Sequence, residues 1–183
     1  MNETEQRYAL IEAGFRLAER MQPADLTPRA IAAEAQLEVD AVALLFGDQE
    51  QYLAAMQQKF LDQIMTAVYV ATDGLVTGYD RLCKGAVAYL DACLTRRKLR
   101  GWLIRARLKQ AAVADGLRKQ NQTYLEILPA EFAAMRWPHP QAGARLYLAA
   151  LQEVARLEHS GGEPRAELRN ALWQFLRTYD RQA

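Results

Sequence analysis

The chain has 183 residues, of which 51% are hydrophobic and 25% charged, and its formal net charge is +1. This composition excludes an intrinsically disordered chain and suffices for one large domain, or for one medium domain with a small appended module. The sequence has no run of roughly 18 apolar residues, so no membrane span is predicted, and its acidic, polar start is unlike a secretory leader. Cys83 and Cys93 are too few for a disulfide framework, so we expect free thiols and a cytoplasmic location.

Residue usage favours an all-α fold of about nine helices. The strong helix formers are abundant, with 32 alanines and 25 leucines against only 8 valines and 5 isoleucines. No proline lies between Pro28 and Pro129, which is typical of consecutive long helices.

The first 48 residues are expected to form three short helices. Apolar residues recur every three or four positions between Leu10 and Met21, as on the buried face of a helix. Thr27 followed by Pro28 is typical of a helix start, and Gly47 is typical of a helix end. The predicted helices cover residues 4–21, 28–35 and 39–46.

Six further helices are expected over residues 49–183. Asp48, with Gln51 three residues later, resembles a capping box at the start of the first of them. Glycine and proline clusters then indicate the loops, because these residues interrupt helices. The predicted helices cover residues 49–72, 79–94, 96–109, 115–135, 141–158 and 164–181, and Tyr179 belongs to the buried stripe of the last one.

Charge is distributed unevenly along the chain. Residues 1–60 hold ten acidic and five basic side chains, a net charge of −5, whereas residues 81–119 hold eleven basic and two acidic ones, a net charge of +9. The basic segment is either a solvated helix face or a patch for an anionic ligand, nucleic acid or an acidic partner.

Side chains that could support catalysis or bind a metal are scarce. His139 and His159 lie in predicted loops without a second metal ligand at helical spacing, and Cys83 and Cys93 would lie roughly 15 Å apart along one helix. The chain has no glycine-rich phosphate loop and no serine-elbow motif, and Ser160 is its one serine. We therefore expect no enzyme, no cofactor and no metal.

Residues 9–53 resemble the opening of the tetracycline-repressor-like (TetR) family of bacterial transcriptional regulators. That opening has an apolar pair, a small pair and a leucine, followed at fixed spacings by a threonine, an Ile-Ala pair, an alanine and a phenylalanine. The matching residues here are Leu10-Ile11, Ala13-Gly14, Leu17, Thr27, Ile31-Ala32, Ala35 and Phe46. The resemblance implies a helix-turn-helix head over residues 1–48 and a ligand-binding and dimerisation body over residues 49–183.

The resemblance also implies which residues of the head would meet DNA. The family's Gly-Val-Ser turn is replaced here by Gln36-Leu37-Glu38, its Tyr and His before the Phe by Ala43 and Leu44-Leu45, and the Lys that opens the fourth helix by Gln49. In the family, the Tyr and Lys positions touch DNA phosphates and the Ser position starts the recognition helix. The candidate DNA-binding residues are Thr27, Arg29, Glu38, Val39, Asp40, Ala43, Leu44 and Gln49.

Two functional interpretations remain open. In the first, a dimer is a one-component regulator that binds duplex DNA through its heads and releases it when a small molecule enters the body. In the second, the fold has lost strong DNA binding and acts through a ligand or a protein partner. The second is favoured by the acidic head, because DNA affinity comes largely from cations that neutralise phosphates, and by a third helix with few hydrogen-bond donors.

By resemblance, the fourth to seventh helices would enclose the ligand, although ordinary core packing is the alternative for each residue there. Arg105 lies one turn from Trp102 and could pair with an anionic effector or with Glu126. The candidate ligand-binding residues are Met65, Tyr69, Tyr89, Cys93, Trp102, Arg105 and Tyr124.

A homodimer through the last two helices is also expected. These helices carry more apolar residues than one chain can cover, so a four-helix interface across a two-fold axis would bury them. The alternative is that both helices simply close the monomer. The apolar positions concerned are Leu146, Tyr147, Ala150, Leu151 and Val154 in one helix and Ala171, Leu172, Phe175 and Leu176 in the other.

Overall fold

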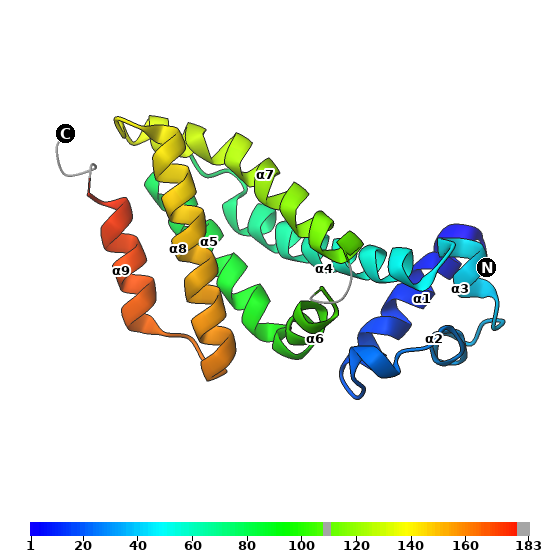
Figure 1. The fold of residues 1–183 in the computed structure, drawn as a ribbon. Coiled ribbons are helices and arrows are strands. Elements are labelled where there is room, and N and C mark those ends of the chain that lie inside the picture. The colour runs from blue at the N-terminus through cyan, green and yellow to red at the C-terminus, as the bar shows by residue number, and fades with distance from the viewer. Residues whose placement is uncertain (108–110, 179–183) are drawn as a thin grey trace. The chain divides into compact units, whose positions relative to one another are not determined.

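The computed structural model describes residues 1–107 and 111–178, apart from the side chains of residues 107, 111–117 and 120. Within these ranges the chain forms nine α-helices and one turn of 3₁₀ helix, with no β-strand, so the all-α prediction is confirmed (Figure 1). The predicted ends of two helices, at residues 108–109 and 179–181, and Tyr179 lie outside the described residues. The helices are α1 (Glu3–Ala18), α2 (Pro28–Ala35), α3 (Ala41–Phe46), α4 (Gln49–Thr72), α5 (Tyr79–Thr95), α6 (Arg97–Arg107), α7 (Ala111–Ala134), α8 (Pro140–Gly161) and α9 (Ala166–Leu176).

The chain divides into two compact units. The first unit consists of Met1–Asp62 together with Lys98–Arg118, and the second consists of Gln63–Arg97 together with the described residues from Lys119 onward. The helices α4 and α7 each contribute residues to both units. The expected functional division between residues 48 and 49 stays a prediction.

In the first unit, local caps set the starts of the helices. Asn2 and Glu5 form a reciprocal capping box at α1, and the Thr27 hydroxyl accepts a hydrogen bond from the Ala30 N–H at α2. Asp48 accepts from the Gln51 N–H at 2.8 Å, as the sequence pattern predicts for α4. These bonds satisfy backbone donors that have no partner within their own helix.

The turn between α2 and α3 contains a left-handed residue that is not glycine. Gln36 has a φ of 57° and ends α2, with its N–H donating to the Ala33 carbonyl. The helix α3 then begins at Ala41, two residues later than predicted, because Glu38 to Asp40 form a turn closed by the Ala41 N–H and the Glu38 carbonyl. The exposed length of the third helix is therefore shorter than its sequence suggests.

The core of the first unit joins distant segments through buried polar contacts. The Tyr52 hydroxyl of α4 donates to the Leu10 carbonyl of α1 at 2.8 Å. The Trp102 indole of α6 donates to the Met21 carbonyl at 2.9 Å, and Trp102 is fully buried. Thus α6 packs with the chain that follows α1.

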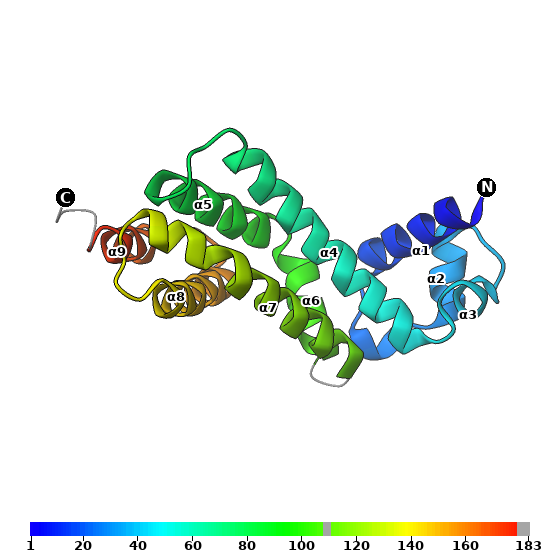
Figure 2. The ribbon, with the colours of Figure 1, turned by 90° about the horizontal axis from the view of Figure 1, so that it is seen from above.

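The second unit is a helical layer in which α8 packs against both α5 and α9. Both views show α8 and α9 side by side (Figures 1 and 2). Its core contains Phe132, whose ring meets those of Trp137 and Tyr147 edge to face. The helix α8 runs to Gly161, so His159 and Ser160 lie in its last turn, whereas the sequence pattern predicts a loop there.

A buried carboxylate ties α8 to α9. Glu158 is 1% exposed and accepts two hydrogen bonds from the Arg169 guanidinium, at 2.7 and 2.9 Å, and a third from the Arg165 N–H. Arg169 also pairs with Asp91 of α5 at 2.8 Å. Burial alone would raise the pKa of Glu158, but the hydrogen bonds from Arg169 and Arg165 outweigh it and hold the pKa below its ordinary value.

None of the helices within the described ranges combines the length and the apolar character that crossing a bilayer requires.

Candidate DNA-binding face and candidate ligand pocket

Five predicted DNA-binding residues, in α3 and in the turn before it, contribute to the exposed surface of the first unit. We call the surface that these five form the α3 face. Val42 and Phe46 are buried and hold α3 in place, which leaves Ala43 and Leu44 between them exposed. Val39 is 60% exposed and Leu44 is 75% exposed. The α3 face consists of Glu38, Val39, Asp40, Ala43 and Leu44.

The α3 face has little to offer a base pair or a phosphate. Its side chains supply two carboxylates and no hydrogen-bond donor, although good discrimination in the major groove usually comes from bidentate donors and amides. A carboxylate near the phosphate backbone is repelled. The chemistry of this surface is therefore acidic and apolar.

Most basic side chains of residues 1–60 have a carboxylate or an aromatic ring as a partner. Arg16 and Arg20 both bind Glu34, Arg16 at 2.7 Å. The hydrogen bond from Arg16, with that from Arg20, holds the pKa of Glu34 below its ordinary value despite the opposing effect of desolvation. Arg7 pairs with Glu3 and lies over the Phe46 ring, and Lys59 lies over the Tyr8 ring.

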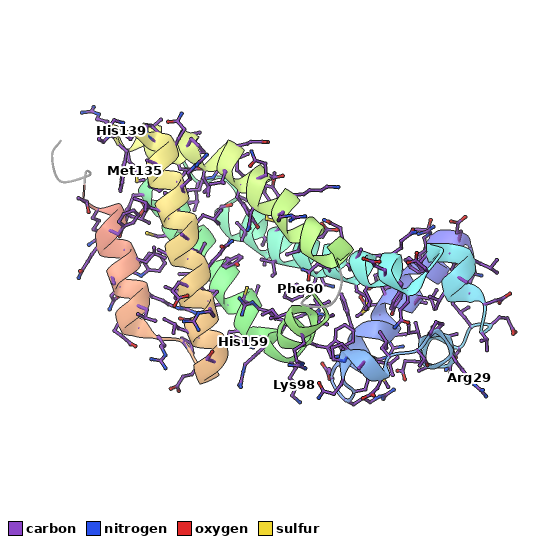
Figure 3. The ribbon with its side chains drawn as sticks, in the orientation of Figure 1. Arg29, Phe60, Lys98, Met135, His139 and His159 are labelled. Atoms are coloured by element: carbon purple, nitrogen blue, oxygen red, sulfur yellow. The ribbon has the colours of Figure 1, made fainter. Side chains whose placement is uncertain are left out.

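Arg29 is the exception among the five basic residues of positions 1–60. It lies exposed near the start of α2 (Figure 3), and the described residues provide it with no carboxylate or ring partner. Thr27, two positions earlier, is exposed, and its hydroxyl oxygen caps α2 by accepting a hydrogen bond from the Ala30 N–H. Gln49 is half-buried, and its amide donates to the Leu26 carbonyl at 2.6 Å, so it anchors the start of α4.

A cavity of about 260 Å³ lies in the second unit, between α4, α5, α7 and α8. Most of its wall is apolar, and four tyrosine rings line it. Two oppositely charged side chains are also part of the wall. The lining residues are Met65, Val68, Tyr69, Thr72, Thr77, Arg81, Leu82, Gly85, Tyr89, Tyr124, Ile127, Leu128, Ala130, Glu131, Tyr147, Leu148 and Leu151.

The two charged groups of the wall, Arg81 and Glu131, pair with each other. Arg81 Nε lies 3.3 Å from Glu131 Oε1, and the Gly78 N–H donates to Glu131 Oε2 at 2.7 Å. The Glu131 side chain is largely buried, whereas that of Arg81 is partly exposed. Each carboxylate oxygen therefore has a partner, and the charges of the wall cancel.

Several hydroxyl groups of the wall donate within the protein. Tyr147 donates to the Leu82 carbonyl at 3.0 Å, Thr72 donates to the Val68 carbonyl at 2.8 Å, and Tyr124 donates to Met65 Sδ. Burial raises the pKa of Tyr147, so this hydroxyl keeps its proton at neutral pH.

The predicted ligand-binding residues divide between the two units. Met65, Tyr69, Tyr89 and Tyr124 line the cavity together. Cys93 is buried on α5 but is not part of the wall. Trp102 and Arg105 belong to the first unit: Trp102 is a core residue there, and Arg105 is exposed on α6.

Sequence reasoning missed the Arg81–Glu131 pair. The two residues are 50 positions apart, so no local spacing links them. The available signal was Glu131 itself, the one charged residue in the run from Ile127 to Met135. A lone charge among apolar residues indicates a buried partner or a functional group.

Within the described ranges, no three histidine, cysteine, aspartate or glutamate side chains gather closely enough to hold a metal ion.

Solved structures of similar fold include proteins described as TetR-family transcriptional regulators and one described as a multidrug binding protein. A TetR-like transcriptional regulator from Rhodococcus sp. RHA1 has a TM-score of 0.72 at 19% identity, with 93% of each chain covered. A TetR-family transcriptional regulator from Streptomyces coelicolor has a TM-score of 0.71 at 16% identity, over 98% of this chain and 80% of that one. The multidrug binding protein EbrR, solved with imidazole, has a TM-score of 0.69 at 21% identity, over 94% and 90%.

No protein-family model matches the sequence, and no curated protein sequence matches it. The structural likeness nevertheless extends over nearly the whole chain, and it shows that the chain has the TetR fold.

Proposed function

We propose that this chain, which has the fold of TetR-family regulators, is a ligand-responsive transcriptional regulator that acts as a homodimer. The observation that carries the proposal is the cavity in the second unit, which combines a largely apolar wall with a few polar groups. Small-molecule sites in proteins have this character. The names of the similar structures support the regulatory part of the proposal, and EbrR supports the ligand-binding part.

The helix α4 supports a route from ligand to DNA. It supplies Met65, Tyr69 and Thr72 to the cavity wall, and the same continuous helix starts at Gln49, one of the candidate DNA-binding residues. A ligand that displaces the second half of α4 would bias the position of its first half. Under this proposal, the ligand changes DNA affinity because it binds one position of α4 better than the other.

A second candidate function is favoured by the α3 face. This surface carries two carboxylates and two exposed aliphatic side chains, and Arg29 is the one cation of residues 1–60 without a described partner. Such a head suits a regulator-like protein that no longer binds DNA strongly and acts through its ligand or a protein partner.

A salt titration separates the two functions. The full-length chain is mixed with a random duplex library at low salt, bound DNA is selected over several rounds, and the dissociation constant of the recovered pool is measured from about 50 to 300 mM KCl. A regulator that binds DNA yields a palindromic site, and Arg29→Ala lowers affinity for it. Each phosphate neutralised contributes a slope of about −0.9 in log–log form.

The control is Arg7→Ala, because Arg7 already has Glu3 and the Phe46 ring as partners. This variant should leave DNA affinity nearly unchanged. Failure to enrich any sequence at the lowest salt concentration contradicts the DNA-binding proposal and supports the second function.

A further inference from the structure

The wall of the cavity restricts the chemistry of what it can hold. Its charged groups, Arg81 and Glu131, are already paired, so the site has no net charge of its own. A ligand with a full charge would be moved from water into a largely apolar cavity without an opposite charge to receive it, and such a transfer is unfavourable. The balance of charge therefore favours a neutral ligand.

The hydrogen-bond donors of the wall are not all paired within the protein. Both oxygens of Glu131 have a partner: Oε1 forms the ion pair with Arg81 Nε, and Oε2 accepts a hydrogen bond from the Gly78 N–H. The Tyr147 and Thr72 hydroxyl protons are used on carbonyls of the protein. The guanidinium of Arg81 carries five N–H donors, and its Nε is the atom that pairs with Glu131. Its two terminal amino groups remain for an acceptor outside the described side chains.

Shape and size add to this description. Tyr69, Tyr89, Tyr124 and Tyr147 line the space, which suits a flat, apolar body. At about 30 Å³ for each water-sized group, a cavity of about 260 Å³ accommodates roughly nine such groups.

We infer that the cavity binds a small, neutral, mainly aromatic molecule with a carbonyl oxygen, and that the terminal amino groups of Arg81 donate to that oxygen. This inference rests on the proposed function in that it takes the cavity as the effector site. It separates the site from one for organic cations, because the guanidinium of Arg81 already neutralises Glu131 and would repel a second cation beside it. It also separates the site from one for carboxylates, which would place a second anion beside Glu131 on the same guanidinium.

The test uses three probes that differ only in the terminal group: 3-phenylpropanamide, 3-phenylpropanoate and 3-phenylpropylamine. Binding to the full-length chain is measured at neutral pH by isothermal titration calorimetry, without DNA. We expect the amide to bind about tenfold or more tightly than either charged probe, which corresponds to one hydrogen bond to a charged group.

Two variants assign the selectivity to the pair. Arg81→Gln should lower the affinity for the amide about tenfold, because the donor to its carbonyl oxygen is lost. It should raise the affinity for the amine, because the carboxylate of Glu131 then lacks its cation. The double variant Arg81→Gln with Glu131→Gln should bind the amide as weakly as Arg81→Gln but show no gain for the amine. The reason is that the introduced glutamine is neutral, although its amide oxygen can still accept from the Gly78 N–H. If the pair had only a structural role, Arg81→Gln would lower the affinity for all three probes together. Circular dichroism checks that each variant is folded.

Tighter binding of the propanoate or of the amine by the unaltered chain would overturn the inference, as would failure of all three probes to bind at millimolar concentration or an unchanged probe order in Arg81→Gln. None of these results depends on DNA. The proposed regulatory function is judged by the DNA selection, so the two can fail separately.

Discussion

The hydroxyl of Tyr52 donates to the carbonyl of Leu10 directly above Gly14, so that α1 and α4 meet where α1 has no side chain. A methyl group at position 14 would overlap this hydroxyl and would lie 2.7 Å from Met56 Sδ. Tyr52 is fully buried, and burial raises its pKa, so it stays a neutral donor. The glycine is therefore required by packing.

Gly14→Ala is expected to destabilise the protein by about 2 kcal/mol, because overpacking a tight core costs more than the better helix propensity of alanine returns. Urea unfolding followed by circular dichroism measures the change. Adding Tyr52→Phe to Gly14→Ala removes the overlapping oxygen and should recover part of the loss. Equal stabilities of Gly14→Ala and the unaltered chain would contradict this packing argument.

Replacing Gln36 by glycine should stabilise the first unit. Gln36 holds a left-handed backbone with φ at 57°, a conformation that costs a residue with a side chain about 1–2 kcal/mol. Gln36→Gly removes this cost but increases the entropy of the unfolded chain, so a net gain of about 1 kcal/mol is expected. The matched control, Ala33→Gly within α2, should lose a similar amount. Thermal unfolding compares the two, and a destabilised Gln36→Gly variant would contradict the expectation.

Glu158→Gln should be strongly destabilising. The change leaves the largely buried Arg169 with Asp91 as its remaining carboxylate, and breaking a buried ion pair from one side costs about 3 kcal/mol. Urea unfolding at neutral pH measures the loss. As a control, Glu153→Gln removes the carboxylate of an exposed pair with Arg156 and should change stability little.

The contribution of Glu158 should disappear in acid. Its pKa in the folded chain lies below the ordinary value of 4.5, so the unfolded chain binds the proton first as the pH falls. The stabilisation is complete above about pH 4.5 and is lost as the pH drops through the folded pKa. The stability difference between the unaltered chain and Glu158→Gln should therefore shrink in this acid range, and a difference that stays constant throughout it would contradict the assignment.

Helix starts were predictable because their signals are local. Thr27 and Asp48 cap α2 and α4 as their sequence contexts indicate. The unit that α6 joins was not predictable, since an apolar stripe does not specify which surface covers it. Trp102 packs in the core of the first unit, although the family resemblance placed it among the candidate ligand-binding residues with core packing as the alternative. Arg81 and Glu131 meet only after α5 and α7 have packed, so no pattern within either helix could pair them.

The apolar positions of α8 divide into two sets, which sharpens the prediction of a homodimer. Tyr147, Leu151 and Val154 are buried within the second unit, whereas Leu146 is 59% exposed and Ala150 is exposed. The predicted interface thus depends on a narrower strip of α8 than the sequence suggests. The buried strip, with Tyr147, Leu151 and Val154, packs inside the second unit of the same chain.

Leu146→Glu should shift the chain from dimer to monomer, because it introduces a charge into the predicted interface. Light scattering at micromolar concentration measures the mass, and Val76→Glu, at an exposed position before α5, is the control that should remain dimeric. A mass of 20.7 kDa for the unaltered chain would show that no stable dimer forms.

The bond from the Gly78 N–H to Glu131 has a consequence for biosynthesis. The start of α5 receives this carboxylate from a residue 53 positions later in the chain. At about 5–20 residues per second, a ribosome needs roughly 3–10 s to add those residues. During this interval the nascent α5 lacks its cap and the wall of the cavity lacks one side. The second unit therefore matures late in translation, when α7 has left the ribosome and can pack against α5.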